Sequence, residues 1–226
     1  EIDKTNEYYI LIDKFQSNFL SLKSENFKIE VIDTPVGRVA IHKWYYKSLP
    51  SYINKINPDV IHIPNNFLIP KNTFNVVYTI FDLAEFDAPE KHGYLKSILR
   101  RFIVKRNVKY ATQILTISEF TKKQIIKYTK IYPEKIINAF AGIEKDKFSV
   151  ARFQGIIKDI KDRQIPDKYF LYAGAIEKTK NIETLIKAIY ILNNQSENEY
   201  TLVLAGGFGT AIDDIKNLVS KLFLDK

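Results

Sequence analysis

Small or polar residues follow five short apolar runs of this sequence, and this spacing marks positions where chemistry could take place. They are Asp82, Ser118, Gly142, Gly174 and Gly206. If the runs are parallel strands, these residues lie at carboxyl strand ends, where α/β sheets bind their ligands. Asp82 would then face a ligand and could accept hydrogen bonds from its hydroxyl groups. Because an unpaired carboxylate is costly there, it could instead form a structural salt bridge or a loop cap.

A lysine, Lys180, follows the apolar run 169–176, which has Gly174 near its end, and begins the amphipathic segment 180–194. Its ammonium could neutralise a diphosphate while free amides at the start of the next helix bind the oxygens. Gly174 would let the backbone approach the same group, or it could form an ordinary tight turn. Asn181 could contact the ligand or only cap the helix, and Lys180 could be one of many solvated lysines.

Another helix is expected over residues 119–130, with Ser118 as its N-cap. A serine cap and an acid in the first turn both stabilise a helix start, and this explains Ser118 and Glu119 fully. A contact with a ligand at the same strand end is the functional alternative for both residues.

The composition excludes several kinds of site. The 226 residues include no cysteine, so disulfides and thiolate metal sites are excluded and a reducing compartment is favoured. The three histidines, His42, His62 and His92, lack ligand spacing, so no metal site is expected on them. A net charge of +8 favours anionic partners, although a lysine-rich composition alone explains it equally well. No nucleic-acid-binding module is recognisable, so no nucleic-acid partner is expected.

Strand-like and helix-like segments alternate along the chain. Strands are expected at 7–13, 27–33, 59–64, 75–83, 113–118, 169–176 and 200–207, and a further short strand ends at Gly142. Helices are expected at 38–57, where Pro50 kinks or divides the segment, and at 94–111, 119–130, 180–194 and 211–223. Because the apolar runs are nearly continuous, they predict parallel sheets that are covered on both faces.

This alternation predicts an α/β fold with two Rossmann-like domains, whose parallel sheets have a cleft between them. We place one domain at residues 1–148 and the start of the second at 149–226. The chain has no methionine, opens close to a strand and stops where another strand is expected. We therefore expect a piece of a longer protein, with the second domain truncated.

The expected helix 94–111 is strongly basic. Its leucine, isoleucine and phenylalanine residues are interpreted as ordinary core. Its cations could bind acidic lipid headgroups, each adding about 1 kcal/mol near an anionic surface, or they could form a solvated face. These cations are Lys96, Arg100, Arg101, Lys105, Arg106 and Lys109.

Several stretches resemble, in order, motifs of the family 4 glycosyltransferases, a retaining group with the B-type two-domain fold. The stretch "VVYTIFDLAEFDAPE" is similar to the family's T-I-H-D-L…P-E segment, and "ILTISEFTKKQIIKY…YPEKIINAFAGIEKDKF" to its V-S-E-F-S…P-E-K-I…N-G segment. The stretch "FLYAGAIEKTKNIETLIKAIYIL" resembles the opening of the donor domain, G-x-h-E-x-R-K-N, where h is apolar. With "INPDVIHIPNNFLIP" and "YTLVLAGG", which resemble two further strands, the resemblance covers most of positions 55–224.

The resemblance implies a hexosyltransferase that moves a sugar, mannose by the weight of the family, from a UDP- or GDP-linked donor to a glycan or lipid-linked acceptor. It implies no metal and no cofactor besides the nucleotide sugar. The implied location is cytoplasmic, at the inner face of the membrane, and the implied role is in surface polysaccharide or lipopolysaccharide synthesis. The implied roles are catalysis by Asp82 and Lys180, donor binding by Gly174, Lys180 and Asn181, and acceptor binding by Asp82, Ser118 and Glu119.

Three departures from the family pattern leave alternatives open. Phe81 replaces the family's histidine, Ala141 its asparagine and Thr179 its arginine. The family's donor-binding glutamate pair is expected after Lys226, and its glycine-rich first loop before Glu1. The alternatives are a non-catalytic glycosyltransferase-like protein that binds a sugar or a partner, and a sugar-nucleotide epimerase of the same architecture.

Overall fold

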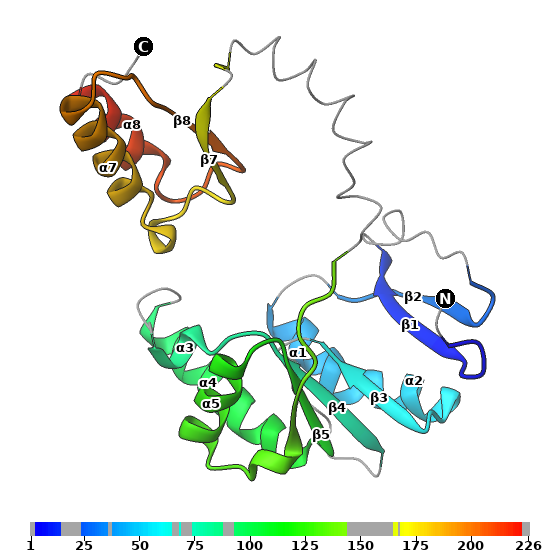
Figure 1. The fold of residues 1–226 in the computed structure, drawn as a ribbon. Helices are drawn as coiled ribbons and strands as arrows, with labels where there is room; N and C mark the ends of the chain where they lie inside the picture. The colour runs from blue at the N-terminus through cyan, green and yellow to red at the C-terminus, as the bar shows by residue number, and fades with distance from the viewer. Residues whose placement is uncertain are drawn as a thin grey trace. The chain divides into compact units, whose positions relative to one another are not determined.

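The computed structural model describes residues 3–14, 24–35, 38–64, 68, 74–87, 93–143, 165–166 and 168–222. The chain divides into two compact units, Glu1–Ala141 and Gly142–Lys226, each built of strands and helices (Figure 1). Every strand pair in the described ranges is parallel. The predicted α/β class with Rossmann-like units is confirmed, whereas the predicted domain boundary at 148/149 lies outside the described residues.

The first unit contains two parallel sheets. Strands β1 (Tyr8–Asp13) and β2 (Phe27–Ile32) form one, and β3 (Val60–Ile63), β4 (Asn75–Ile80), β5 (Gln113–Thr116) and β6 (Ile136–Asn138) form the other in that order. The helical elements are α1 (Arg38–Lys47), α2 (Leu49–Ile56), α3 (Ala84–Asp87), α4 (Tyr94–Tyr110), α5 (Glu119–Thr129) and the 3-10 turn η3 (Pro133–Lys135). Helices therefore connect β4 to β5 and β5 to β6, as parallel neighbours require.

A proline divides the first helical segment. Helix α1 ends at Lys47 and α2 begins at Leu49, with Pro50 in its first turn, where the missing N–H breaks no helical bond. Helix α2 ends at Ile56, and its C-cap Asn57 takes the left-handed conformation (φ +50°) and donates its N–H to the carbonyl oxygen of Ile53. The expected kink or division at the proline is therefore confirmed as a division.

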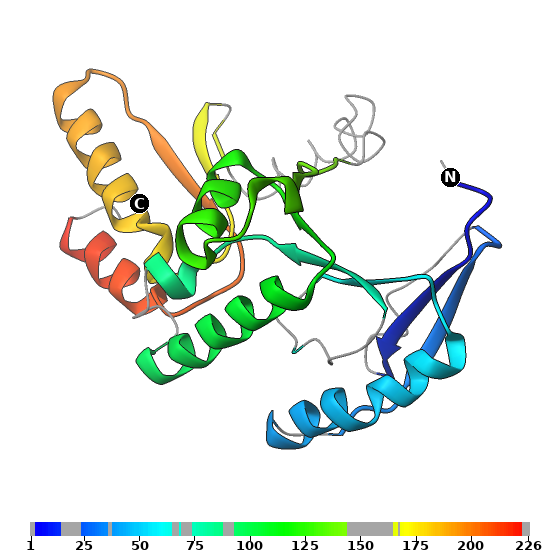
Figure 2. The same ribbon diagram turned by 90° about the horizontal axis from the view of Figure 1, so that it is seen from below.

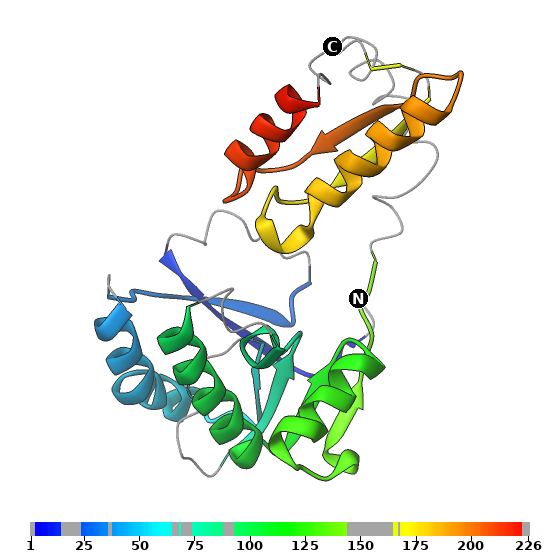
Figure 3. The same cartoon turned by 90° about the vertical axis from the view of Figure 1, so that its left-hand side faces the viewer.

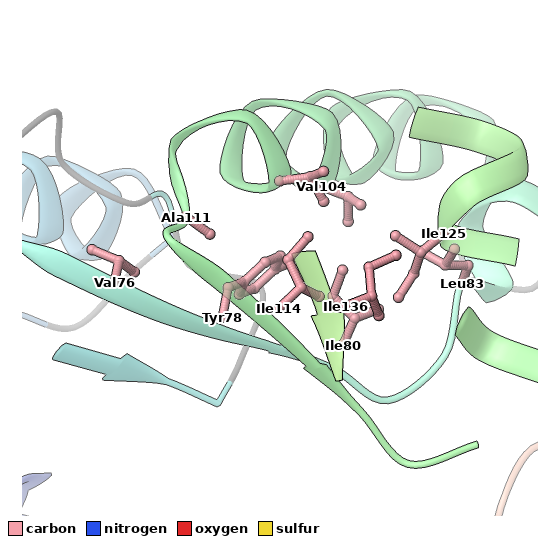
Figure 4. Close-up of a cluster of buried hydrophobic side chains, with 10 residues drawn as sticks. Val76, Tyr78, Ile80, Leu83, Val104, Ala111, Ile114, Ile125 and Ile136 are labelled. Carbon is pink, nitrogen blue, oxygen red and sulfur yellow. The ribbon is translucent and has the colours of Figure 1, made fainter. Parts of the chain in front are cut away.

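The core of the first unit lies between the second sheet and helices α4 and α5 (Figure 4). Strand β4 supplies Val76, Tyr78 and Ile80 at alternate positions, which share one face of the strand. Val104 of α4 and Ile125 of α5 approach these side chains from the helical side (Figure 4). The apolar run of β4 is therefore buried up to its carboxyl end, as the sequence predicts.

The last strand of this sheet is shorter than predicted. Strand β6 ends at Asn138 and not at Gly142. Phe140 has a left-handed backbone (φ +54°), and its N–H donates to the side chain of Asn138 (3.2 Å), so the chain leaves the strand there. The predicted strand end at Gly142 is wrong, and Asn138 takes that place at the edge of the sheet.

The described part of the second unit consists of β7 (Tyr169–Ala173), the 3-10 turn η5 (Lys178–Lys180), α7 (Ile182–Gln195), β8 (Thr201–Ala205) and α8 (Ile212–Lys221). Both helices lie on the same side of the β7–β8 pair (Figure 2), and α7 runs alongside β8 (Figure 3). Ile186 of α7 and Ile215 of α8 belong to the core there, against which Leu202 and Leu204 of β8 pack. In this described part, helices cover one face of the pair, where cover on both faces was expected.

Candidate functional site

Three neighbouring strands of the first unit end at one edge of their sheet. The register pairs Ile80 of β4 with Thr116 of β5, and Thr116 with Asn138 of β6. Because the strands are parallel, the residues that follow them gather at this edge. Asp82 and Ser118, both predicted on the acceptor side, follow β4 and β5 and therefore lie at neighbouring strand ends.

Ser118 caps α5 as predicted, and it also contacts a second hydroxyl. Its oxygen accepts the N–H of Thr121 (3.1 Å) and lies 2.9 Å from the Thr121 hydroxyl. That hydroxyl donates to the carbonyl oxygen of Phe81 (3.2 Å), the residue before Asp82. Thr121, which is buried, thus joins the start of α5 to the end of β4. The sequence patterns did not single out Thr121, although Ser-x-x-Thr at a helix start was an available signal.

Glu119 is held at the same edge by a residue of β6. The Asn138 side-chain amide donates to Glu119 Oε1 (2.9 Å). Glu119 is exposed and lies in the first turn of α5, where its charge complements the helix dipole. Asn138 was not singled out from the sequence, because the strand end was expected four residues later, at Gly142.

Asp82 has an exposed side chain directly after β4. Its Oδ1 accepts the N–H of Ala84 (3.0 Å), so it caps the short helix α3. The loop-cap alternative is therefore confirmed. Within the described ranges Oδ2 has no hydrogen-bond partner, and the role of Asp82 toward an acceptor stays a prediction.

A buried acid, Glu85, lies in the short helix α3 that follows this edge. Its side chain is 2% exposed, and its Oε1 has no hydrogen-bond partner among the described residues. Burial raises the pKa of Glu85 above the usual glutamate value. Arg101 of α4 donates its Nε–H to the main-chain oxygen of Glu85 (2.6 Å). Glu85 was not singled out from the sequence, since an acid between a strand and a proline resembles a solvated loop residue.

We expect Glu85→Gln to stabilise the first unit at neutral pH by about 1 kcal/mol, because the amide has the shape of the carboxyl group but carries no charge that burial penalises. A carboxyl group with a raised pKa binds its proton more tightly in the folded state. Its contribution to stability is therefore present below the ordinary value of 4.5 and is lost as pH rises through the folded pKa. The stability difference between the variant and the wild type should grow with pH.

Urea unfolding at several pH values measures this difference through the fluorescence of Trp44, the only tryptophan. The control is Glu134→Gln, the same change at an exposed glutamate, which should leave stability unchanged. A stability gain in Glu85→Gln that does not depend on pH would contradict the expectation.

Ser118→Ala should destabilise the first unit by about 1 kcal/mol, because α5 loses the hydroxyl that accepts the N–H of Thr121 in its first turn. Ser48 offers a matched control, since it also occupies an N-cap position but makes no side-chain cap bond. Ser48→Ala should therefore be close to neutral in the same Trp44 fluorescence measurement. Equal losses in the two variants would mean that the capping bond is not the source of the stability.

The strands of the second unit end in loops whose backbones lie in direct contact. The Gly174 N–H donates to Ala205 O (2.9 Å) and the Ile176 N–H to Gly207 O (3.0 Å), so pairing continues past the two strands. The close contact between the two loop backbones requires a glycine at position 206, because a Cβ atom there would overlap the carbonyl group of Gly174. Gly174 and Gly206 therefore lie at adjoining strand ends, as predicted.

Lys180 is the last residue of η5, directly before α7, and its side chain is exposed. Its ammonium forms no ion pair with any residue that the structure describes, whereas the neighbouring Lys178 binds Asp214 of α8 (Nζ–Oδ2 2.7 Å). The position at a helix start is the one predicted from the sequence, and the role of Lys180 toward a ligand stays a prediction.

Asn181 occupies the N-cap position of α7 in the left-handed conformation (φ +52°). Its side chain accepts a hydrogen bond from the Thr184 hydroxyl (2.8 Å) and makes no cap bond with a helix N–H. The Asn181 side chain therefore does not cap the first N–H groups of α7. Uncapped N–H groups at the start of a helix can bind phosphate oxygens, and Lys180 places a cation beside them. The described residues contain no group of three or more His, Asp or Glu side chains that could hold a metal ion.

Comparison with known proteins gives a family match and several relatives. Residues 154–226 match the family described as "Glycosyl transferases group 1". The O-antigen chain mannosyltransferase B of Escherichia coli is 26% identical over 163 residues, which cover 72% of this chain and 43% of that protein. The chain therefore spans less than half the length of this relative.

Two solved structures resemble the fold. WaaG, described as a glycosyltransferase involved in lipopolysaccharide biosynthesis, gives a TM-score of 0.60 at 16% identity over 91% of this chain and 57% of its own. HepE from Anabaena, solved in complex with UDP, gives a TM-score of 0.60 at 15% identity over 88% of this chain and 54% of its own. At these identities the likeness shows the fold alone.

Proposed function

We propose that this chain, a homologue of an O-antigen mannosyltransferase with a group 1 glycosyltransferase match, is part of a retaining hexosyltransferase. It would move a sugar, mannose first, from a UDP- or GDP-linked donor to a glycan or lipid-linked acceptor in surface polysaccharide synthesis. One observation carries the proposal. Residues 154–226, which match the family, belong to the unit in which Lys180 stands at the start of α7 without an ion pair among the described residues.

The second unit would hold the leaving diphosphate. During transfer the bond between the anomeric carbon and the diphosphate oxygen breaks, and its electron pair stays with that oxygen. The acceptor oxygen bonds to the anomeric carbon, and its proton passes to the leaving diphosphate. The Lys180 ammonium and the first amides of α7 would stabilise the growing negative charge, because preorganised positive charge acts most strongly where charge develops. Gly174 would let the backbone approach the phosphates, and Asn181 would add an amide contact.

The first unit would hold the acceptor at the carboxyl edge of β4 and β5. Asp82 has one carboxylate oxygen on Ala84, and the other could accept a hydrogen bond from an acceptor hydroxyl and orient it. Ser118 and Glu119 would contact further hydroxyl groups. Thr121 would hold the ends of β4 and β5 in place relative to each other, because its hydroxyl forms hydrogen bonds with Phe81 and with Ser118.

The partners in this proposal are a nucleotide sugar, a glycan or lipid-linked acceptor and an anionic membrane surface on the cytoplasmic side. The structure of HepE with UDP and the description of WaaG as acting in lipopolysaccharide biosynthesis support the donor and the pathway class. None of the helices in the described ranges has the length and apolar character needed to cross a membrane.

Product analysis of the intact protein with sugar-labelled UDP- and GDP-linked hexoses tests the proposal. In the presence of glycan or lipid-linked acceptors we expect release of nucleoside diphosphate and label in the acceptor with retained anomeric configuration. An altered nucleotide sugar without release of diphosphate would establish the epimerase alternative. Donor binding without any turnover would establish the non-catalytic alternative, which Phe81, Ala141 and Thr179 motivate.

A further inference from the structure

Two groups of apolar side chains on the first unit are exposed. One group lies on the outer side of α4 and consists of Leu95, Ile98, Leu99 and Phe102. The interpretation of these four residues as core is wrong, because the helix can turn only one of its apolar faces toward β4. Arg101 was expected among the lipid-binding cations, and this expectation is corrected, because its guanidinium donates to two main-chain oxygens of α3 (2.6 and 3.4 Å). The second group lies where β4, β5 and β6 end.

The second group consists of three phenylalanines, one after each of these neighbouring strands. Phe81 comes directly after β4, Phe120 lies in the first turn of α5 after β5, and Phe140 comes two residues after β6. Their side chains are 51%, 68% and 67% exposed. One exposed phenylalanine is ordinary, but one at each of three adjoining strand ends indicates a binding surface. We name these three residues the aromatic edge.

Hydrogen bonds hold the backbone of the aromatic edge in place. The Thr121 hydroxyl of α5 donates to the carbonyl oxygen of Phe81 (3.2 Å). The Asn138 side chain binds in two directions, since its amide donates to Glu119 Oε1 (2.9 Å) and its oxygen accepts the N–H of Phe140 (3.2 Å). The two α5 residues in these bonds flank the phenylalanine of that helix. The three rings are therefore carried by positions that are bonded to one another through their neighbours.

Phe140 keeps its ring in spite of an unfavourable backbone. Its φ of +54° lies in the left-handed region, which bulky side chains rarely adopt and which glycine or asparagine would occupy at lower cost. Because the ring is two-thirds exposed, burial does not explain a phenylalanine here. Backbone strain that the surrounding bonds maintain is typical of a functional site.

We propose that the aromatic edge binds the terminal sugar ring of the acceptor, with a face of the pyranose stacked on a phenylalanine ring. The C–H groups of a pyranose carry a weak positive charge and pack on the negative face of an aromatic ring. Hydroxyl groups at the rim of the sugar would donate to the carboxylates of Asp82 and Glu119, which directly neighbour Phe81 and Phe120 in the chain. Aromatic contacts with a few placed polar groups are typical of small-ligand sites.

The two acids at this edge favour an uncharged sugar over the lipid part of an acceptor. The exposed carboxylates of Asp82 and Glu119 accept hydrogen bonds from hydroxyl groups but repel a phosphate group. An apolar chain laid on the phenylalanines would remove water from these carboxylates and offer no hydrogen bond in return. The inference rests on the proposed function, which it deepens by naming the part of the acceptor that the first unit holds.

A nuclear magnetic resonance titration of the intact protein with three neutral oligosaccharides, mannotriose, maltotriose and chitobiose, tests the inference. At least one of them should shift the amide signals of the aromatic edge, and its own C–H signals should move upfield because they lie over aromatic faces. Phe120→Ala should weaken this binding about fivefold, since one stacking contact is lost. Phe140→Gly should weaken it similarly, although this change also relieves the backbone strain.

Two further variants at position 120 separate stacking from general apolar contact. Phe120→Tyr keeps the aromatic face and should bind the oligosaccharide as the wild type does. Phe120→Leu keeps apolar area without an aromatic face, so it should weaken the binding. A prenyl chain would make no such distinction, and farnesyl phosphate is the probe for it.

Tyr132→Ala is the matched control, since Tyr132 is an exposed aromatic residue just before η3 and β6, at the opposite edge of the same sheet. This variant should bind the oligosaccharide as the wild type does. Phe120→Ala and Phe140→Gly should keep the wild-type unfolding midpoint, because both replaced side chains are mostly exposed.

The inference would be overturned if none of the oligosaccharides bound, or if Phe120→Ala and Phe140→Gly bound them as tightly as the wild type. Farnesyl phosphate that shifts the same amides, with full affinity in Phe120→Leu, would also overturn it and assign the edge to an apolar lipid chain. Since no nucleotide sugar is added, a failure contradicts the sugar-stacking surface and not the transfer reaction.

Discussion

Lys180→Ala is expected to lower kcat/KM for sugar transfer about 100-fold, measured as release of nucleoside diphosphate from the preferred donor. The loss should fall mainly on kcat, because the ammonium meets its full negative charge only as the sugar–phosphate bond breaks. Affinity for the free nucleoside diphosphate should fall about tenfold, since one charged contact with phosphate is lost.

Lys187→Ala is the matched control for this prediction. Lys187 is an exposed lysine in α7, so its removal takes the same charge from the same unit, away from the start of the helix. The control should keep wild-type kinetics. Equal losses in the two variants would indicate an effect of net charge and would contradict the assignment of Lys180 as the diphosphate-binding cation.

Gly206→Ala should destabilise the second unit by about 3 kcal/mol or more, which is a large effect for one methyl group. A Cβ atom at this position would overlap the carbonyl oxygen of Gly174 and lie 2.6 Å from its carbonyl carbon. The loops after β7 and β8 would have to separate, although the Ile176 N–H is bonded to Gly207 O. Because Gly174 is displaced, the variant should also bind nucleoside diphosphate more weakly.

Gly207→Ala serves as its control, since a Cβ atom there meets nothing within 4 Å. Urea unfolding followed by circular dichroism measures both variants. The fluorescence of Trp44 reports on the first unit, which should unfold at the same urea concentration as in the wild type. If the two glycine variants were equally stable, the close backbone contact between the loops could not be a requirement of the fold.

The order and type of the main elements could be predicted because neighbouring residues determine them. The expected helix 94–111 is found as Tyr94–Tyr110, and Pro50 divides the first helical segment. Ser118 caps α5 through a bond that spans three residues. Patterns of this kind are local, so the sequence shows them without knowledge of the tertiary fold.

The orientation of α4 could not be predicted from its sequence, because apolar residues occupy both faces. Leu99 and Val104 are equally good core residues by type, and packing against β4 and the bonds of Arg101 decide which one is buried. The end of β6 was missed for a similar reason. Asn138 is held by Glu119, nineteen residues earlier in the chain, and no local pattern reports such a partner.

The rule that ligands bind at the carboxyl ends of parallel strands placed Asp82, Ser118, Gly174 and Lys180 at or just after strand ends. The rule could not predict the hydrogen bonds that hold these strand ends in place. One of them joins Thr121 to Phe81, which are forty residues apart. The buried Glu85 also depends on tertiary packing, since its neighbours in sequence are those of a loop. The cleft expected between the two domains stays a prediction.

The most direct test of the central proposal is a nuclear magnetic resonance titration of the isotope-labelled intact protein with UDP and with GDP. We predict that the largest changes in amide signals occur at Gly174 and Ala175 after β7 and at Ile182 and Glu183 in the first turn of α7, and that Lys180→Ala weakens them. Binding of either nucleotide that leaves these four amides unchanged would contradict the placement of the donor diphosphate at this site.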